Sequence, residues 1–534
     1  MKSPGFHIII LVTLVLSSVL FRFTNLNWDS GNRIHPDEAL IVNGANSIRW
    51  VSNLNPNFHD YNGFPVYLLS SISQFTKHVS IEDMTIVGRH LSAFISSISV
   101  LLFYLLLIKL FPPTIALAST TAFSFSPLLI QLAHFYTTDS ILVFLLILLL
   151  FYMYNYSVKP SIKNLIFLSI PLGLSIAAKN TGYLFVPLPL MALLFSKQSI
   201  NQKLAHATLL TATTITIFFF TSPYSFLDFS GYLSRSKYLS DVVSGKLNFD
   251  WTVQFQETTP LYWFVQTLWA FGPLAIVGPI GMGLLMKNQK QEKRKYFLLP
   301  IAIWTFGFMI FLSLTYLKFI RYNAPLAPLY ALGFGYLLQK FTKQPIAVFL
   351  IQTLLIVQVL YGTMFFSIYT TPHTSLQAAE WITKNIPNTS NLLREEWNNI
   401  IRYDKNPLQE KKFSVGSLNF YTLVDNNKVD TLIDTLLTND YIILDSPKVR
   451  NTIHRLSDTY PYTAAFYDLL ENGALGFIKV AEFTNYPRIG SIEINDEGAE
   501  ETFTIFDHPT VHIYQKQRQL TKKEISLMLS SNIR

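Results

Sequence analysis

Long apolar runs separated by short polar segments dominate the first two thirds of the chain. The first run spans residues 6–23, and a helix needs about 20 apolar residues to cross a bilayer core. No small-x-small cleavage site follows it, so we interpret it as an uncleaved anchor. Ten further runs cover residues 91–110, 114–132, 138–156, 164–179, 182–195, 206–222, 261–286, 296–317, 323–339 and 345–367. The pattern predicts a polytopic α-helical membrane protein with about eleven transmembrane helices.

Three segments are too polar to cross a membrane. Residues 25–90 and 223–260 are predicted to be external loops of a transmembrane domain that covers residues 1–370. Residues 371–534 mix two periodicities: SLQAAEWITKNI and VRNTIHRLSD have a helical pattern, whereas DYIILDS, FIKVAEF and ETFTIFDHPTVHIYQK have the pattern of strands. We therefore expect a soluble C-terminal α/β domain.

The distribution of charge predicts the orientation in the membrane. With the N-terminus inside, the cytoplasmic segments hold thirteen basic residues and a single acidic one, Glu292. The basic residues are Lys2, Lys109, Lys159, Lys163, Lys197, Lys203, Lys287, Lys290, Lys293, Arg294, Lys295, Lys340 and Lys343. Eleven spans then make the C-terminal domain extracytoplasmic, in a multi-pass protein of the cell membrane.

Composition removes several classes of protein. Only 14% of the residues are charged, against about 25% in soluble proteins, and 50% are hydrophobic, which excludes intrinsic disorder and a coiled coil. The net charge of +8 is explained by the cytoplasmic cations, so a nucleic-acid partner is not predicted. The absence of cysteine excludes a disulfide scaffold, thiol catalysis and cysteine-ligated zinc.

Ionisable residues near the membrane gather on the predicted outer side, where each is a candidate for function because such groups are costly there. They are His35, Asp37, Glu38, Arg89, His90, His134, Asp139, Lys179, Lys318 and Arg321. Ordinary roles remain open: the acidic residues are also suited to helix starts, and the cations to anchoring at the interface. A three-histidine metal site is a further alternative, although no H-E-x-x-H motif supports it.

This set of residues suits one kind of chemistry. An anionic leaving group needs cations, and a hydroxyl nucleophile needs a carboxylate base. A lipid-linked phosphosugar would keep its polyprenyl tail in the bilayer, its phosphate near the cations and its sugar outside. No P-loop, G-x-G-x-x-G or G-x-S-x-G motif points to ATP-driven transport or serine hydrolysis.

Several motifs also resemble a known family. HPDE (35–38), YNGFPVYLLS (61–70), AHFYTTDS (133–140), GLSIAAKNTG (173–182), TSPYSFLDF (221–229) and KFIRYNAPLAP (318–328) resemble elements of the dolichyl-phosphate-mannose protein mannosyltransferase superfamily. AAEWITKNIPNTSNLLREEW and TFTIFDHPTVHIY resemble an extracytoplasmic domain that some prokaryotic members carry. The resemblance implies the GT-C fold and a glycosyltransferase that uses a lipid-phosphate sugar. The absence of a Trp-Trp-Asp triplet argues against the oligosaccharyltransferase branch.

The resemblance also implies the reaction and its catalytic residues. Asp37 would be the general base on the acceptor hydroxyl, and Glu38 would orient it or bind acceptor or sugar. Arg89 would pair with these acids. Direct attack at the anomeric carbon implies inversion and release of polyprenyl phosphate, with no nucleotide and no predicted cofactor. A divalent metal near His35 and Glu38 remains an alternative that the reaction does not require.

The remaining matched positions would bind substrate. Lys179 would contact the donor phosphate, with Arg321 a second contact and Lys318 a weaker one, and Asp139 would support the donor or acceptor site. His134 and Tyr61, which belong to the matched motifs, complete the predicted set. The expected partners are a polyprenyl-phosphate sugar, an acceptor hydroxyl on protein Ser/Thr or on a glycolipid, and membrane lipid.

Two other classes of protein remain as alternatives. A transporter or flippase for a lipid-linked sugar would have polar groups at the bilayer midplane on broken helices, and a repeated architecture. A non-catalytic membrane assembly protein would use the soluble domain to bind a partner. The clustering of the candidate residues at the outer helix ends favours the enzyme.

Overall fold

The computed structural model describes residues 4–287, 292–396, 413–422 and 426–533. Lys2, Lys290 and Trp397, which entered the charge and motif arguments above, lie outside the described residues. The chain divides into two compact units, each assembled from three segments. Unit 1 comprises Met1–Leu26, His35–Leu247 and Glu257–Phe366, and unit 2 comprises Asn27–Ile34, Asn248–Gln256 and Ser367–Arg534.

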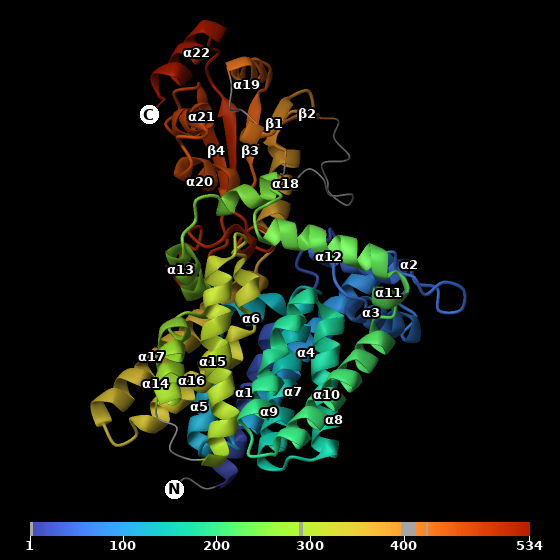
Figure 1. The fold of residues 1–534 in the computed structure, drawn as a ribbon. Coiled ribbons are helices and arrows are strands. Elements are labelled where there is room, and N and C mark those ends of the chain that lie inside the picture. The colour runs from blue at the N-terminus through green and yellow to red at the C-terminus, as the bar shows by residue number, and fades with distance from the viewer. Residues whose placement is uncertain (1–3, 288–291, 397–412, 423–425, 534) are drawn as a thin grey trace. The chain divides into compact units, whose positions relative to one another are not determined.

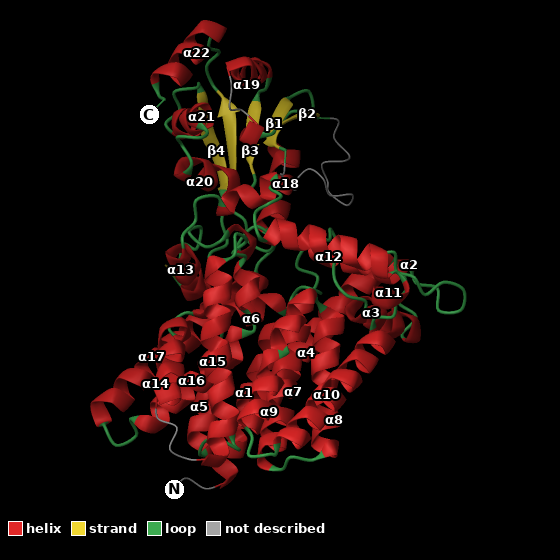
Figure 2. Ribbon diagram, viewed as in Figure 1, coloured by secondary structure: helices red, strands yellow, loops and turns green. Residues whose placement is uncertain are grey.

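Unit 1 is helical (Figures 1 and 2). Its first half contains α1 (Pro4–Phe23), α2 (Pro36–Ser47), α3 (Phe64–Phe75), α4 (Ile81–Leu107), α5 (Pro113–Ser124), α6 (Pro127–Leu132), α7 (Thr138–Val158) and α8 (Ile162–Ala178). Its second half contains η1 (Asn180–Phe185), α9 (Pro187–Phe195), α10 (Ile200–Thr221), α11 (Tyr224–Leu227), α12 (Phe229–Val243), α13 (Pro260–Phe271), α14 (Leu274–Lys287), α15 (Glu292–Leu314), η3 (Ile320–Asn323), α16 (Leu326–Lys340) and α17 (Pro345–Phe366).

The helical fold is as predicted, whereas the predicted count of about eleven spans is not confirmed by helix length and composition. Among the described residues, six helices are long and apolar enough to cross a membrane: α1, α4, α7, α10, α15 and the segment that begins with α17. A seventh crossing is added if α13 and α14, which meet at 108°, form one bent span. The other predicted spans correspond to shorter apolar helices, such as α8 and η1 with α9, or to a broken pair, α5 and α6.

The breaks have local causes in the sequence. Between α13 and α14, Gly272 has φ 56° and ψ −140°, a conformation that glycine adopts readily, and the following Pro273 lacks the N–H that would continue the helix. Between α5 and α6, Pro127 occupies the first turn of the new helix after Phe125. Both breaks divide apolar runs that look continuous in the sequence.

A buried arginine, Arg22, donates a hydrogen bond to the end of α5 at the break between α5 and α6. The Arg22 side chain on α1 is fully buried and donates to Ser124 O, at the end of α5, over 2.9 Å. It also donates to the hydroxyls of Ser96 and Ser18, each over 2.8 Å. The last carbonyl groups of a helix lack partners within the helix, so the guanidinium satisfies one of them where water is excluded. We therefore assign Arg22 a structural role.

Unit 2 is an α/β domain with a five-stranded mixed sheet in the order β2-β1-β3-β7-β4. Strand β1 runs parallel to β2 and β3, whereas β7 is antiparallel to β3 and β4. The strands are β1 (Asn391–Glu395), β2 (Ser414–Leu418), β3 (Tyr441–Leu444), β4 (Phe477–Phe483) and β7 (Val511–Lys516), and a separate hairpin pairs β5 (Arg488–Ile489) with β6 (Ile492–Glu493). The helices are α18 (Thr374–Asn385), α19 (Asn426–Thr438), α20 (Lys448–Arg455), α21 (Pro461–Glu471) and α22 (Lys522–Ser531).

Apolar side chains cover both faces of this sheet. Leu393 and Ile442 point to a core shared with α19–α22, while Leu392 and Ile443 point to a second core shared with α18. Successive side chains of a strand point to opposite faces, so a run such as YIIL supplies both cores. The helices therefore flank the strands on two sides, as Figure 2 shows.

One predicted strand in unit 2, ETFTIFDHPTVHIYQK, is confirmed in its second part and wrong in its first. The segment ETFTIFD alternates like a strand, but Glu501–Phe503 forms a 3-10 helix, η7, and only Val511–Lys516 joins the sheet. The Glu500 carboxylate accepts hydrogen bonds from the backbone N–H and the hydroxyl of Thr502. This local bonding competes with strand pairing, which alternation alone cannot reveal.

Buried ionisable groups in unit 2 predict that it is more stable in mild acid. Burial raises the pKa of Glu395 to about 8, although the Tyr467 hydroxyl donates to it over 2.5 Å. Burial also raises the pKa of Glu501 to about 7. Folded unit 2 therefore binds more protons than the unfolded chain between the usual glutamate pKa, about 4.5, and pH 8. Its stability should fall there as pH rises, by roughly 1 kcal/mol per pH unit for one such carboxyl group.

His508 adds a dependence of the same sign. Burial lowers its pKa, but Asp507, at 2.5 Å, and Asp496, at 3.0 Å, raise the net value to about 10. The stability it contributes is complete below the usual pKa of 6.5 and is lost as pH rises toward 10. The predicted fall in stability can be measured by hydrogen exchange of the full chain at pH 5.5 and 7.5, followed in the peptides that contain β1 and β3. If the stability of unit 2 changes with pH as much in Glu395→Gln as in the wild type, Glu395 is not the source of the pH dependence.

Candidate active site

Asp37 forms an ion pair with Arg321 in unit 1. Pro36 starts α2 with its fixed φ, so Asp37 lies in the first turn, where a carboxylate also suits the helix dipole. Arg321 lies in η3, between α15 and α16. Arg321 Nη2 is 2.9 Å from Asp37 Oδ2, and the two side chains are only 12% and 15% exposed. The fold thus joins two predicted site residues that are far apart in the sequence.

Asp139 forms a second ion pair, with Lys179. Asp139 lies in the first turn of α7, and Lys179 is the extended residue that ends α8. Lys179 Nζ donates to Asp139 Oδ1 over 3.0 Å, and both side chains are largely buried. Lys179 therefore turns toward protein groups and does not extend to an interface with water, which was its ordinary alternative.

Two tyrosines connect the ion pairs. Lys179 Nζ lies 5.6 Å from the ring centre of Tyr61 and 5.3 Å from that of Tyr322, within the range of cation–π attraction. The Tyr61 hydroxyl is hydrogen-bonded to Asp37, and the Arg321 guanidinium lies 5.9 Å from the Tyr322 ring. Sequence reasoning did not select Tyr322, although it belongs to the quoted KFIRYNAPLAP motif. We name Asp37, Arg321, Asp139, Lys179, Tyr61 and Tyr322 the paired-charge cluster.

The electrostatics keep Asp37 ionised. Burial alone would raise its pKa, but the charges of Arg321 and Lys179 and the Tyr61 hydrogen bond hold the pKa of Asp37 below its usual value. Burial lowers the pKa of His35 to about 4, so this neighbour is neutral near pH 7 and adds no charge there. Burial and then Asp37 raise the pKa of Tyr61 well above 10, so its hydroxyl stays a donor.

Glu38, predicted to act beside Asp37, lies in a different environment. Its carboxylate and the Arg89 guanidinium are completely buried, and Arg89 Nη2 is 2.6 Å from Glu38 Oε2. Glu38 also accepts from the Tyr136 backbone N–H over 2.8 Å, and Arg89 donates to Leu26 O. Consecutive helical residues point about 100° apart, which separates the two neighbouring acids. We therefore propose that Glu38 and Arg89 support the site and do not touch substrate.

His134 and Lys318 bind backbone groups. His134 is buried, with Nδ1 2.8 Å from Ile130 O and Nε2 3.0 Å from Thr24 O. Lys318 Nζ donates to Thr315 O over 2.7 Å, and burial lowers its pKa.

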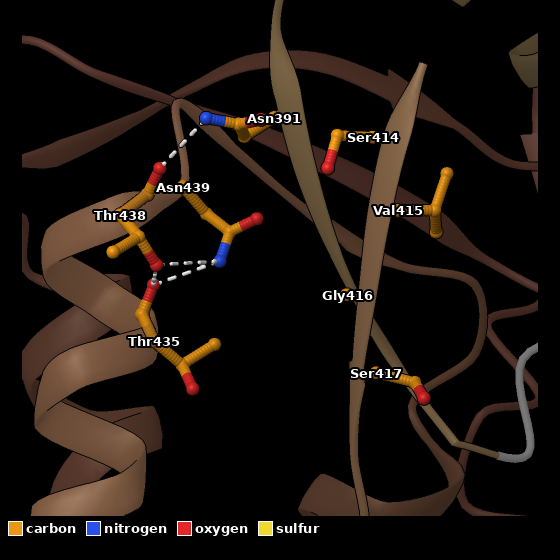
Figure 3. Close-up of a pocket in the computed structure, with 8 residues that line it drawn as sticks. All are labelled: Asn391, Ser414, Val415, Gly416, Ser417, Thr435, Thr438 and Asn439. Carbon is orange, nitrogen blue, oxygen red and sulfur yellow. Dashed lines mark hydrogen bonds between the residues drawn. The ribbon is translucent and has the colours of Figure 1, made fainter. Parts of the chain in front are cut away.

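Metal-ligating side chains and the pocket of the soluble domain can each be compared with the paired-charge cluster over the described residues. Within the described ranges, no group of three or more His, Asp or Glu side chains could hold a metal ion. A polar pocket of about 350 Å³ lies in unit 2 beside the edge strand β2 (Figure 3). Its lining residues are Asn391, Ser414, Val415, Gly416, Ser417, Thr435, Thr438 and Asn439. None of them is charged, so this pocket lacks an acid, a base and a phosphate-binding cation.

Comparisons with known proteins relate these features to a family. Residues 75–222 match the family described as dolichyl-phosphate-mannose-protein mannosyltransferase. This segment contains Asp139 and Lys179 but not Asp37 or Arg321. No curated protein sequence matches the chain significantly.

Solved structures show the fold over most of the chain. The archaeal oligosaccharyltransferase AglB from Archaeoglobus fulgidus is 14% identical, with a TM-score of 0.52 over 92% of this chain and 74% of that one. ArnT from Cupriavidus metallidurans is 12% identical, with a TM-score of 0.50 over 96% of this chain and 98% of that one. Residues 75–222 thus carry the sequence signature of the mannosyltransferase family, and most of the chain has the GT-C fold of membrane glycosyltransferases.

Proposed function

We propose that the chain is an inverting glycosyltransferase that moves a monosaccharide from a polyprenyl- or dolichyl-phosphate carrier to an acceptor hydroxyl. The observation that carries this proposal is the paired-charge cluster, in which an ionised carboxylate lies beside two buried cations. The similar AglB structure contains a dolichol-phosphate and an inhibitory peptide, and the ArnT structure contains undecaprenyl phosphate. Both support a lipid-phosphate donor.

The cations are suited to hold the donor phosphate. Arg321 uses Nη2 for Asp37, while its buried Nε has no hydrogen-bond partner among the described residues. A buried N–H without a partner is costly, and a phosphate oxygen would satisfy it. Lys179 supplies a second positive charge. Together they would stabilise the charge that grows on the phosphate as it leaves.

Asp37 is suited to accept the proton. As the acceptor oxygen bonds to the anomeric carbon, the bond from that carbon to the phosphate oxygen breaks, and the hydroxyl proton passes to the Asp37 carboxylate. Attack opposite the departing phosphate inverts the configuration. The products are the glycosylated acceptor and polyprenyl phosphate, and no metal takes part in this scheme. The acceptor hydroxyl belongs to protein Ser/Thr or to a glycolipid.

Donor assays test the function. Purified protein incubated with polyprenyl-phosphate sugars and hydroxyl acceptors should release polyprenyl phosphate, and the absence of release with every donor would contradict the proposal. Lys179→Ala and Arg321→Ala should each weaken donor use by about 1.5–3 kcal/mol, because each loses a charged hydrogen bond. Lys318→Ala is a matched comparison with a smaller expected loss. Normal donor affinity in both variants would remove these cations from the site.

The outer face of the membrane is part of the same proposal. It is supported by the excess of basic residues in the predicted cytoplasmic segments. Reporter fusions after Lys295 and after Thr371 should therefore lie on opposite sides of the cell membrane. If both reporter fusions lie on the same side of the membrane, the side on which the candidate site lies must be reassigned.

A further inference from the structure

Helix α12 is bonded to the loop that carries Tyr61. His59 Nε2 lies 2.8 Å from Asp228 Oδ2, and Asp228 is the residue that caps α12. Asp60 forms an ion pair with Arg235, which lies on α12 itself. Tyr61 is the next residue along the chain, and it contacts both Asp37 and Lys179. The position of Tyr61 thus depends on the position of α12.

The same helix is bonded to the residue that follows Lys179. Asn180 donates to the Ser236 hydroxyl over 3.3 Å and accepts from the Tyr232 hydroxyl over 3.2 Å, and both partners lie on α12. Tyr232 is buried with Ile176 and Ala177 of α8, which precede Lys179. Figure 1 shows α12 crossing the end of the helix bundle, where α2 and α3 also lie. One helix therefore contacts the neighbours of two cluster residues.

We propose that α12 is a brace for the paired-charge cluster, by which we mean a helix whose contacts hold the cluster residues Tyr61 and Lys179 in position. Arg235, through Asp60, is then a positioning residue for the transfer reaction. This inference rests on the proposed function. Arg235 does not touch Asp37 or Lys179 in any contact that the described residues show. It acts through the Asp60 backbone on Tyr61, which orients the carboxylate base and faces the phosphate-binding cation.

The solvent exposure of the Arg235–Asp60 ion pair indicates that the pair positions Tyr61 and adds little to the stability of the fold. The Arg235 and Asp60 side chains are 38% and 24% exposed, unlike the completely buried Arg89 and Glu38. Partly exposed pairs contribute little to the free energy of unfolding. Small displacements of catalytic groups, in contrast, can lower rates about 100-fold. Disrupting this pair should therefore impair the reaction while the protein stays folded.

Charge reversal with rescue tests the brace. Arg235→Asp places two carboxylates together and should lower kcat/KM by about 10- to 100-fold. The exchanged pair, Asp60→Arg with Arg235→Asp, should recover activity to within about threefold of wild type, because the attraction is restored. Lys237→Asp makes the same charge change at an exposed position of α12 and should leave kcat/KM unchanged. Equal losses in all three variants, or none in Arg235→Asp, would overturn the proposal.

A distance measurement tests the proposed brace independently of the proposed reaction. Because the chain has no cysteine, spin labels at Ser71→Cys on α3 and Ser240→Cys on α12 would be the only labelled sites. The distance distribution should be narrow in the otherwise wild-type chain, broad in Arg235→Asp and narrow again in the exchanged pair. An unchanged distribution in Arg235→Asp would refute the brace even if the enzyme is active. Inactive wild-type protein with the expected distances would refute only the proposed function.

Discussion

Asp37→Asn is expected to lower turnover by about 10²–10⁴-fold, the usual contribution of general-base catalysis, or roughly 2.7–5.4 kcal/mol. Asparagine preserves the shape of the side chain but lacks the basic carboxylate oxygen. The surrounding cations already hold the pKa of Asp37 low, so wild-type protein has the base ionised throughout the neutral range. The proton should therefore transfer late, when bond formation has made the hydroxyl acidic.

Donor binding distinguishes loss of the base from loss of the site. In Asp37→Asn, Arg321 loses its carboxylate partner and keeps its charge, so affinity for the donor phosphate should be retained or increased. Acceptor glycosylation and donor binding should be measured on the same folded preparation. Asp139→Asn, the same change in the neighbouring ion pair, should alter apparent affinity as well as turnover. Wild-type turnover by Asp37→Asn would end the case for this base.

Arg89→Met is expected to destabilise unit 1 by about 3–5 kcal/mol, because it leaves the Glu38 carboxylate charged and buried without its partner. The adjoining Asp37–Arg321 pair should tolerate a change better, since it retains some exposure to water. Unfolding of the full chain in detergent by added denaturant gives the measurement. A change below about 1 kcal/mol would show that the pair does not support the fold.

A double variant tests whether the buried charge of Glu38 causes the predicted loss of stability in Arg89→Met. Glu38→Gln removes the charge and keeps an oxygen that can accept from the Tyr136 N–H. Combined with Arg89→Met, it should recover much of the lost stability, because no buried charge remains. If Glu38 instead touches substrate, Glu38→Gln alone should reduce the activity of the folded fraction strongly. Activity that follows only the folded fraction supports its structural role.

The membrane helices could be predicted because burial in lipid constrains composition locally. A run of apolar residues is the same signal whether the helix is straight or broken, so the runs predict the helices but not the breaks at Gly272 and at Phe125. The turn at Gly272 and Pro273 and the interruption at Phe125 depend on a few backbone angles. These angles are stabilised by distant groups, such as Arg22 and Gln358, which bond the carbonyls exposed at Ser124 and Phe125.

By itself, the sequence determined that this chain has membrane helices, an α/β domain and acidic and basic residues at helix ends, because each property depends on nearby residues. It did not determine which charges meet. Asp37 and Glu38 are adjacent and equally acidic, yet one pairs with Arg321 beside two tyrosines and the other with Arg89 in a closed interior. Only the tertiary structure decided this, because helical rotation turns neighbouring side chains to different faces and folding brings distant segments to each of them.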